Sequence, residues 1–238
     1  MGDSQDFGSV ISLLSKYYCC LAVDLPGHGK TRVIGNEICY NMSNTAQALI
    51  RLLDGLQIDK CLLLGYSMGG RLALYMTLHF PDRFERVVLE SASPGLKTKA
   101  EQSQRLQADL QLAQKLENSN IKEFLLNWYD RPLFQSLKNS PKFDRLIEAR
   151  LTNNPIELSK SLRNLGTGNQ PSLWEQLGQN QIPLLLLAGE YDDKFTTINT
   201  EIASLCPAAS LKIVPKTGHN IHWENLDRFV EIVRQFYD

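Results

Sequence analysis

The sequence carries almost no net charge. Its 25 Lys and Arg residues stand against 26 Asp and Glu residues, which gives a formal charge of -1. Nucleic-acid-binding domains normally carry a clustered basic excess, so we exclude that class of protein. Any anionic ligand must then be held by a few cations placed close to it.

Long apolar runs and paired cysteines are also missing. No stretch reaches the roughly 18 apolar residues that a membrane span requires, and the first residues lack the basic and apolar regions of a signal peptide. The five cysteines form no C-x-x-C pair. Reduced thiols in a cytoplasmic protein are the simplest interpretation. No His or Cys cluster has metal-ligand spacing, so we expect neither a metal ion nor a cofactor.

The 238 residues have ordinary globular composition, with 43% hydrophobic and 21% charged residues. Short apolar runs alternate with stretches of helical periodicity, which predicts an α/β fold with a mostly parallel sheet covered on both faces. The strands expected are residues 17–23, 61–64, 87–89, 182–188 and 211–214. The helices expected are residues 43–55, 71–80 and 223–237.

One region departs from this alternation. Between residues 94 and 175 only helical periodicity is present, as in Leu106, Leu110, Ala113 and Leu116. We interpret residues 94–175 as a helical cap inserted into a core made of residues 1–93 and 176–238.

The motif Gly65-Tyr66-Ser67-Met68-Gly69 fits the pattern G-x-S-x-G. It follows an apolar strand and precedes a helix, which is the context of a nucleophile elbow, where a tight turn lifts the serine hydroxyl above the sheet edge. The backbone N–H of Met68, at the helix N-terminus, is then a donor to a developing oxyanion. The motif predicts Ser67 as an activated serine.

An activated serine needs a base and a residue that orients the base, and in this fold class they follow in the order Ser, Asp, His. Asp192 follows the strand around residues 184–187, and His219 follows the strand at 211–214. The predicted triad is Ser67, Asp192 and His219. Asp193 competes with Asp192, although it also suits a helix N-cap. His222 competes with His219, but its place before the last helix suits the surface or a position behind the site.

Arg71 lies one helical turn after Ser67, where a small apolar residue would pack better. A guanidinium there suits a carboxylate of an anionic substrate; a structural ion pair is the alternative. Arg105 and Asp109 have the i,i+4 spacing of a helix-surface ion pair. Trp128 and Arg150 are candidates for the underside of the cap, although aromatic residues there also suit a core.

Several stretches resemble one family specifically. Asp24-Leu25-Pro26-Gly27-His28-Gly29 and Gly65-Tyr66-Ser67-Met68-Gly69-Gly70-Arg71 are similar to the α/β-hydrolase-fold 2-succinyl-6-hydroxy-2,4-cyclohexadiene-1-carboxylate synthases of menaquinone and phylloquinone biosynthesis. The similarity continues through Gly166-Thr167-Gly168-Asn169-Gln170-Pro171-Ser172-Leu173-Trp174 and Gly189-Glu190-Tyr191-Asp192-Asp193-Lys194-Phe195. It covers essentially the whole chain.

The resemblance implies a lyase that eliminates pyruvate from 2-succinyl-5-enolpyruvyl-6-hydroxy-3-cyclohexene-1-carboxylate, with the triad serine acting as the base. It implies a small polycarboxylate substrate, no cofactor, and a monomer or small homo-oligomer. By position, the resemblance implies that Arg71, Arg105 and Arg150 bind the carboxylates of the substrate. The spacing to Arg150 differs by one residue from the spacing in the family. Tyr66 and Trp128 complete the pocket.

The sequence departs from the family at its start. The family has additional early strands and a His-Gly-Phe turn that supplies a second oxyanion donor, and Met1 to Phe7 resembles the tail of that turn. We therefore expect Met1 to be an internal methionine of a longer protein; the alternative is a fragment of low activity.

Two other functions fit the same residues. A serine hydrolase of this fold, acting on esters or C–C bonds, would use the same triad through an acyl-enzyme. A non-catalytic binding protein is the third possibility, and an intact triad argues against it.

Overall fold

The centre of the protein is a four-stranded parallel sheet, in the order β1-β2-β3-β4. The computed structural model describes residues 1–238. The strands are β1 (Cys61–Tyr66), β2 (Phe84–Glu90), β3 (Leu184–Gly189) and β4 (Ala209–Val214). All three pairings are parallel, so the four carboxyl ends meet at one edge of the sheet.

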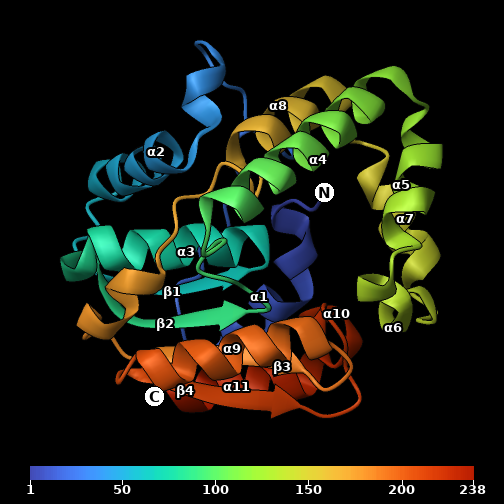
Figure 1. The fold of residues 1–238 in the computed structure, drawn as a ribbon. Coiled ribbons are helices and arrows are strands. Elements are labelled where there is room, and N and C mark those ends of the chain that lie inside the picture. The colour runs from blue at the N-terminus through green and yellow to red at the C-terminus, as the bar shows by residue number, and fades with distance from the viewer.

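Helices cover both faces of this sheet (Figure 1). One face packs against α2 (Met42–Gly55), α3 (Met68–His79) and α9 (Asp193–Leu205), and the other against α1 (Gly8–Leu14), α10 (Ile221–Glu224) and α11 (Leu226–Tyr237). Alternation along each strand explains both contacts, because successive side chains point to opposite faces. Leu184 and Leu186 of β3 join the first core, and Leu185 and Leu187 join the second. The α/β fold expected from the sequence is confirmed.

Five helices lie between β2 and β3 in the chain, and they form the upper and right-hand part of Figure 1. The longest, α4, begins with a capping box in which Thr98 and Glu101 satisfy each other's backbone N–H groups. Its contact with α8 is the most extensive within this region. The five helices are α4 (Lys99–Asn118), α5 (Ile121–Tyr129), α6 (Gln135–Lys138), α7 (Phe143–Arg150) and α8 (Pro155–Leu165).

Two expectations about elements are wrong. Residues 17–23 form no strand, and Tyr17 and Leu21 are more than half exposed. A strand needs a hydrogen-bonded neighbour, and no described segment pairs with this run. The expected closing helix over residues 223–237 is two helices, because Asn225 leaves the helical conformation, with φ -144° and ψ 72°, and its side chain accepts from the Arg228 backbone N–H to begin α11.

No helix of the structure is both long and apolar enough to span a bilayer.

The packing of β3 yields a stability prediction. Leu186 is fully buried in the core that also contains residues of α3 and α9, whereas Leu56 at the end of α2 is 49% exposed. We expect Leu186→Ala to lower the free energy of unfolding by about 2–5 kcal/mol, because it leaves a cavity in the core. Leu56→Ala is the matched control and should change it by less than about 0.5 kcal/mol. Urea denaturation measures both, and equal losses would contradict the core assignment.

Candidate active site

Ser67 occupies a strained turn between β1 and α3. Its backbone has φ 49° and ψ -106°, a conformation that non-glycine residues rarely adopt and that is found at functional sites. The Ser67 N–H donates to the Glu90 carbonyl at 2.8 Å, which attaches the turn to the end of β2. Met68 is the first residue of α3, so its N–H has no acceptor within the helix and is free for an oxyanion.

The tight approach at this turn depends on Gly65 and Gly70. A Cβ at Gly65 would lie 2.5 Å from the Gly69 carbonyl oxygen, and one at Gly70 would lie 2.6 Å from the Ala92 Cβ. A Cβ at Gly69 would meet nothing within 4 Å. Gly65 and Gly70 are therefore the two positions at which only glycine fits, and Gly70 lies one residue beyond the G-x-S-x-G pattern.

Three strand ends bring Ser67, Asp192 and His219 together. His219 Nε2 lies 3.1 Å from Ser67 Oγ, and His219 Nδ1 lies 2.7 Å from Asp192 Oδ2. His219 is 2% exposed and Asp192 is 4% exposed. With Nδ1 donating to the carboxylate, Nε2 is free to accept the serine proton, which is the geometry of a serine–histidine–aspartate triad.

Asp192 has a second role that the sequence analysis gave to Asp193. Asp192 Oδ1 accepts from the Phe195 N–H at 3.2 Å and so caps α9, while Asp193 is exposed. One carboxylate therefore orients His219 and begins a helix. The N-cap expected at Asp193 belongs to Asp192, since Asp193 is already the first residue of the helix.

His222 is not at the surface, contrary to one of the two placements considered for it. It is 4% exposed, and its Nδ1 donates to Glu90 Oε2 at 2.8 Å. Its backbone N–H also donates to Glu90 Oε1, at 3.1 Å. The Phe7 ring stacks on the imidazole with centroids 4.5 Å apart. His222 therefore lies behind the site, bound to the end of β2.

Tyr66 lies between the two histidines. Its ring centroid is 5.4 Å from that of His219 and 4.8 Å from that of His222. Its hydroxyl donates to Asn220 Oδ1 at 2.5 Å. Burial raises the pKa of the Tyr66 hydroxyl well above its ordinary value, so the phenol stays protonated and remains a hydrogen-bond donor.

Arg71 is held by neutral groups only. Its guanidinium donates to Gln170 Oε1 at 2.9 Å and to the Leu165 carbonyl at 3.0 Å. Burial, followed by repulsion from Arg105, lowers its pKa to about 10. The side chain is therefore still charged at neutral pH, and no carboxylate of the protein forms an ion pair with it. The structural ion pair considered from the sequence is absent.

Arg105 is in α4 and Trp128 is in α5, among the helices between β2 and β3. Arg105 Nε donates to Asp109 Oδ1 at 2.7 Å, which is the i,i+4 pair expected from the spacing. The Trp128 ring packs against Phe134 at 6.3 Å, and Phe134 packs edge-on against His219 at 5.7 Å. Trp128 is therefore separated from the triad histidine by a single aromatic ring.

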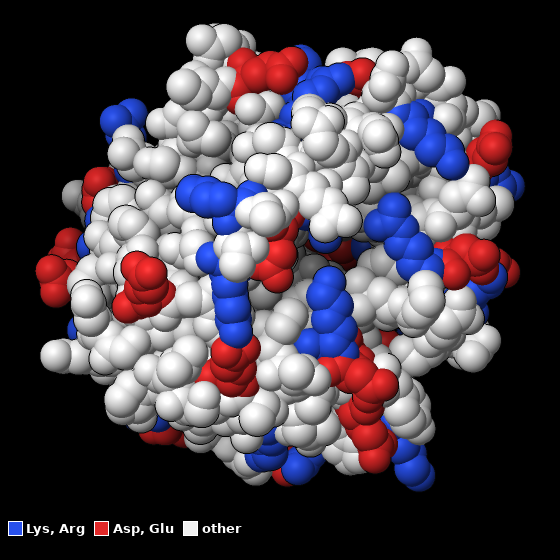
Figure 2. Space-filling view, in the orientation of Figure 1, with Lys and Arg blue, Asp and Glu red and all other residues white.

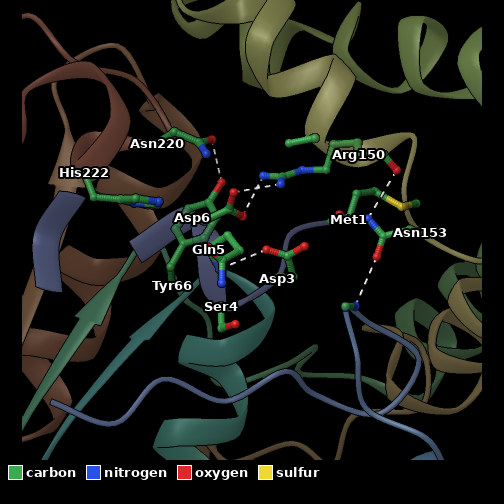
Figure 3. Close-up of polar contacts among 12 residues, drawn as sticks. Met1, Asp3, Ser4, Gln5, Asp6, Tyr66, Arg150, Asn153, Asn220 and His222 are labelled. Carbon is green, nitrogen blue, oxygen red and sulfur yellow. Dashed lines mark hydrogen bonds and ion pairs between the residues drawn. The ribbon is translucent and has the colours of Figure 1, made fainter. Parts of the chain in front are cut away.

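Arg150 differs from Arg71 and Arg105, because its guanidinium is buried and makes a two-bond ion pair with a carboxylate. Its two terminal nitrogens donate to the two carboxylate oxygens of Asp6 at 2.7 and 2.6 Å (Figure 3). The side chains of Arg150 and Asp6 are 3% and 10% exposed. Arg150 Nε also donates to the Tyr129 hydroxyl at 3.3 Å. The sequence analysis assigned the Arg150 guanidinium to a substrate carboxylate. In the structure this guanidinium binds the Asp6 carboxylate of the protein itself.

The Asp6–Arg150 pair yields a second stability prediction. Asp6→Asn leaves the buried Arg150 charge without its counterion, and we expect a loss of about 3–5 kcal/mol in the free energy of unfolding. The control is Glu201→Gln, which breaks the exposed Lys97–Glu201 ion pair and should cost less than about 1 kcal/mol. Urea denaturation of both variants makes the comparison. Similar small losses would show that Arg150 does not depend on Asp6.

Comparison with known proteins gives the same family from sequence and from structure. Residues 1–226 match the family model described as the alpha/beta hydrolase fold. A Bacillus subtilis protein is 39% identical over 91% of this chain and 80% of its own length. The 2-succinyl-6-hydroxy-2,4-cyclohexadiene-1-carboxylate synthase of Serratia proteamaculans is 34% identical over 91% of this chain and 82% of its own.

A solved structure, that of MenH from S. aureus, superposes with a TM-score of 0.94 at 36% identity, covering 99% of this chain and 89% of its own. The enol-lactonase of Burkholderia xenovorans has a TM-score of 0.83 at 18% identity and so shares the fold alone. The chain therefore belongs to the α/β-hydrolase fold family and, within it, to the 2-succinyl-6-hydroxy-2,4-cyclohexadiene-1-carboxylate synthases, as the sequence motifs indicate.

Proposed function

We propose that this protein eliminates pyruvate from 2-succinyl-5-enolpyruvyl-6-hydroxy-3-cyclohexene-1-carboxylate to form 2-succinyl-6-hydroxy-2,4-cyclohexadiene-1-carboxylate, a step of menaquinone or phylloquinone biosynthesis. The observation that carries the proposal is the combination of a connected triad with an unneutralised arginine, Arg71, one helical turn beyond Ser67. Membership of the synthase family supports it. The free cysteines suit a reducing compartment, and we propose the cytoplasm.

The triad supplies the base in this reaction. His219 Nε2 accepts the proton of the Ser67 hydroxyl, and Asp192 stabilises the resulting imidazolium through Nδ1. The serine oxygen removes a proton from the ring carbon. The C–H electron pair at C2 forms the C2=C3 bond, the C3=C4 pair shifts to C4=C5, and the C5–O bond to the enolpyruvyl group breaks. His219 returns its proton to the departing enolate, which leaves as pyruvate, and no acyl-enzyme forms.

Electrostatic stabilisation comes from two directions. The free N–H of Met68 at the start of α3 faces developing negative charge, and such donors typically contribute 100- to 1,000-fold to rate. Arg71 and Arg105 bind substrate carboxylates, since a guanidinium fits a carboxylate with two parallel hydrogen bonds. Tyr66 and Trp128 form pocket walls. Arg150 positions the first turn of the chain through Asp6 and does not itself bind substrate.

We also propose that residues 94–175 act as the cap over the site, with residues 1–93 and 176–238 as the catalytic core. The cap contributes Arg105 and Trp128, and the core contributes the triad and Arg71. The substrate is then enclosed between the two parts, which excludes water from the reacting carbon.

The test is a direct assay of pyruvate release, coupled to lactate dehydrogenase, with the diene product followed by absorbance. Ser67→Ala removes the base, and we expect kcat to fall by at least about 1,000-fold. Arg71→Ala should raise KM by about 10- to 100-fold, because one charged hydrogen-bonded contact to a carboxylate is lost. The controls are Ser204→Ala and Arg51→Ala, exposed residues that form no ion pair.

The alternative is a serine hydrolase, because the same triad and Met68 N–H are the machinery of acyl transfer. A burst of nitrophenol from nitrophenyl esters that depends on Ser67, with no pyruvate released from the enolpyruvyl substrate, would establish that alternative and overturn the lyase.

A further inference from the structure

Cations gather around Arg105, in a protein whose total charge is nearly zero. Repulsion from Arg105 contributes to a lowered pKa at three side chains, namely Arg71, Arg131 and Lys194, and burial is the larger cause at each. The side chain paired with Arg105 is Asp109. Arg131 and Lys194 form no ion pair. We call Arg105, Arg131 and Lys194 the cationic rim.

The cationic rim comes from both parts of the fold. Arg131 follows α5 of the cap, and Lys194 is in the first turn of α9, beside Asp192. Arg131 and Arg105 line one groove of about 420 Å³, together with Lys115 and Asp109. Figure 2 shows Lys and Arg side chains around a hollow between the cap helices and the sheet side of the molecule.

Each outer member of the rim rests on an aromatic ring connected to the triad. The Arg131 guanidinium lies 4.1 Å from the centroid of Trp128, whose neighbour Phe134 contacts His219. The Lys194 ammonium lies 5.6 Å from the centroid of Phe195, and that ring is 4.7 Å from His219. One aromatic ring therefore separates Lys194 from His219, and two separate Arg131 from it, and these rings contact the cations without neutralising them.

The charge of the substrate shows why such cations are needed. The enolpyruvyl substrate carries three carboxylates, on its succinyl arm, its ring and its enolpyruvyl arm. Asp6 saturates Arg150, so Arg71 and Arg105 are the remaining family arginines, and Asp109 already shares the charge of Arg105. The third carboxylate therefore needs further cations. Arg131 and Lys194 form no ion pair and lie on the side of the site where Phe134 and Phe195 contact His219.

We propose that Arg131 and Lys194 are specificity-determining residues that, with Arg105, select a substrate bearing three carboxylates and hold the outer ones. This inference rests on the proposed function for the identity of the substrate, but the anion site itself follows from the placement of the cations. Both side chains act in binding and neither acts in proton transfer.

The first experiment measures the kinetics of Arg131→Gln, Lys194→Gln and the double variant. We expect KM to rise about tenfold for each single variant, the equivalent of one charged contact, with kcat within twofold of the parent chain. The slope of log(kcat/KM) against log salt should become shallower, because fewer charges attract the substrate. Lys138→Gln is the control, since this exposed cap lysine is paired with Asp130.

The second experiment requires no turnover. Calorimetry measures the affinity of tricarballylate, a tricarboxylate, and of succinate, a dicarboxylate, for the parent chain and the same variants at low salt. We expect the variants to lose affinity for tricarballylate about tenfold and to lose the preference over succinate. Weak binding that the variants leave unchanged would overturn the inference.

The two experiments separate the two proposals. Pyruvate release with unchanged KM in both variants would overturn the role of the cationic rim and leave the lyase intact. Loss of tricarballylate affinity in the variants, without pyruvate release by the parent chain, would retain the anion site and overturn the proposed reaction.

Discussion

The hydrogen bond between Asp192 and His219 is the interaction on which the site depends. It joins the ends of β3 and β4, and it is buried, so water does not compete for either partner. Because the same carboxylate caps α9, the orientation of the imidazole and the start of a helix are set together. The helix in turn carries Phe195, whose ring contacts both His219 and the Lys194 ammonium. One buried side chain thus organises the base and its surroundings.

The parallel sheet explains why so much chemistry meets at one edge. Ser67, Asp192 and His219 lie far apart in the sequence but follow the carboxyl ends of β1, β3 and β4, and parallel pairing places those ends side by side. Glu90 ends β2 at the same edge and binds His222. Each strand of the sheet therefore delivers a polar group to the same region, some for chemistry and others for support.

The features that could be predicted from the sequence are those set by residues close together in the chain. The elbow around Ser67 and the strand-then-loop contexts of Asp192 and His219 are local patterns, and so is the i,i+4 pair of Arg105 with Asp109. The prediction of a strand over residues 17–23 was wrong, because an apolar run forms a strand only when a partner strand is available. Arg150 with Asp6 and His222 with Glu90 join positions 144 and 132 residues apart, and no short-range pattern predicts such pairings.

The neutral partners of Arg71 join the first turn of α3 to the end of α8 and the segment that follows it. Gln170 accepts a hydrogen bond from Arg71 and donates one to the Ser93 carbonyl at 3.1 Å, so it joins the segments that precede α4 and follow α8. The Leu165 carbonyl, at the end of α8, is the other acceptor. These two bonds use two of the five N–H donors of the guanidinium. The contacts that fix Arg71 in place therefore leave donors for a further acceptor.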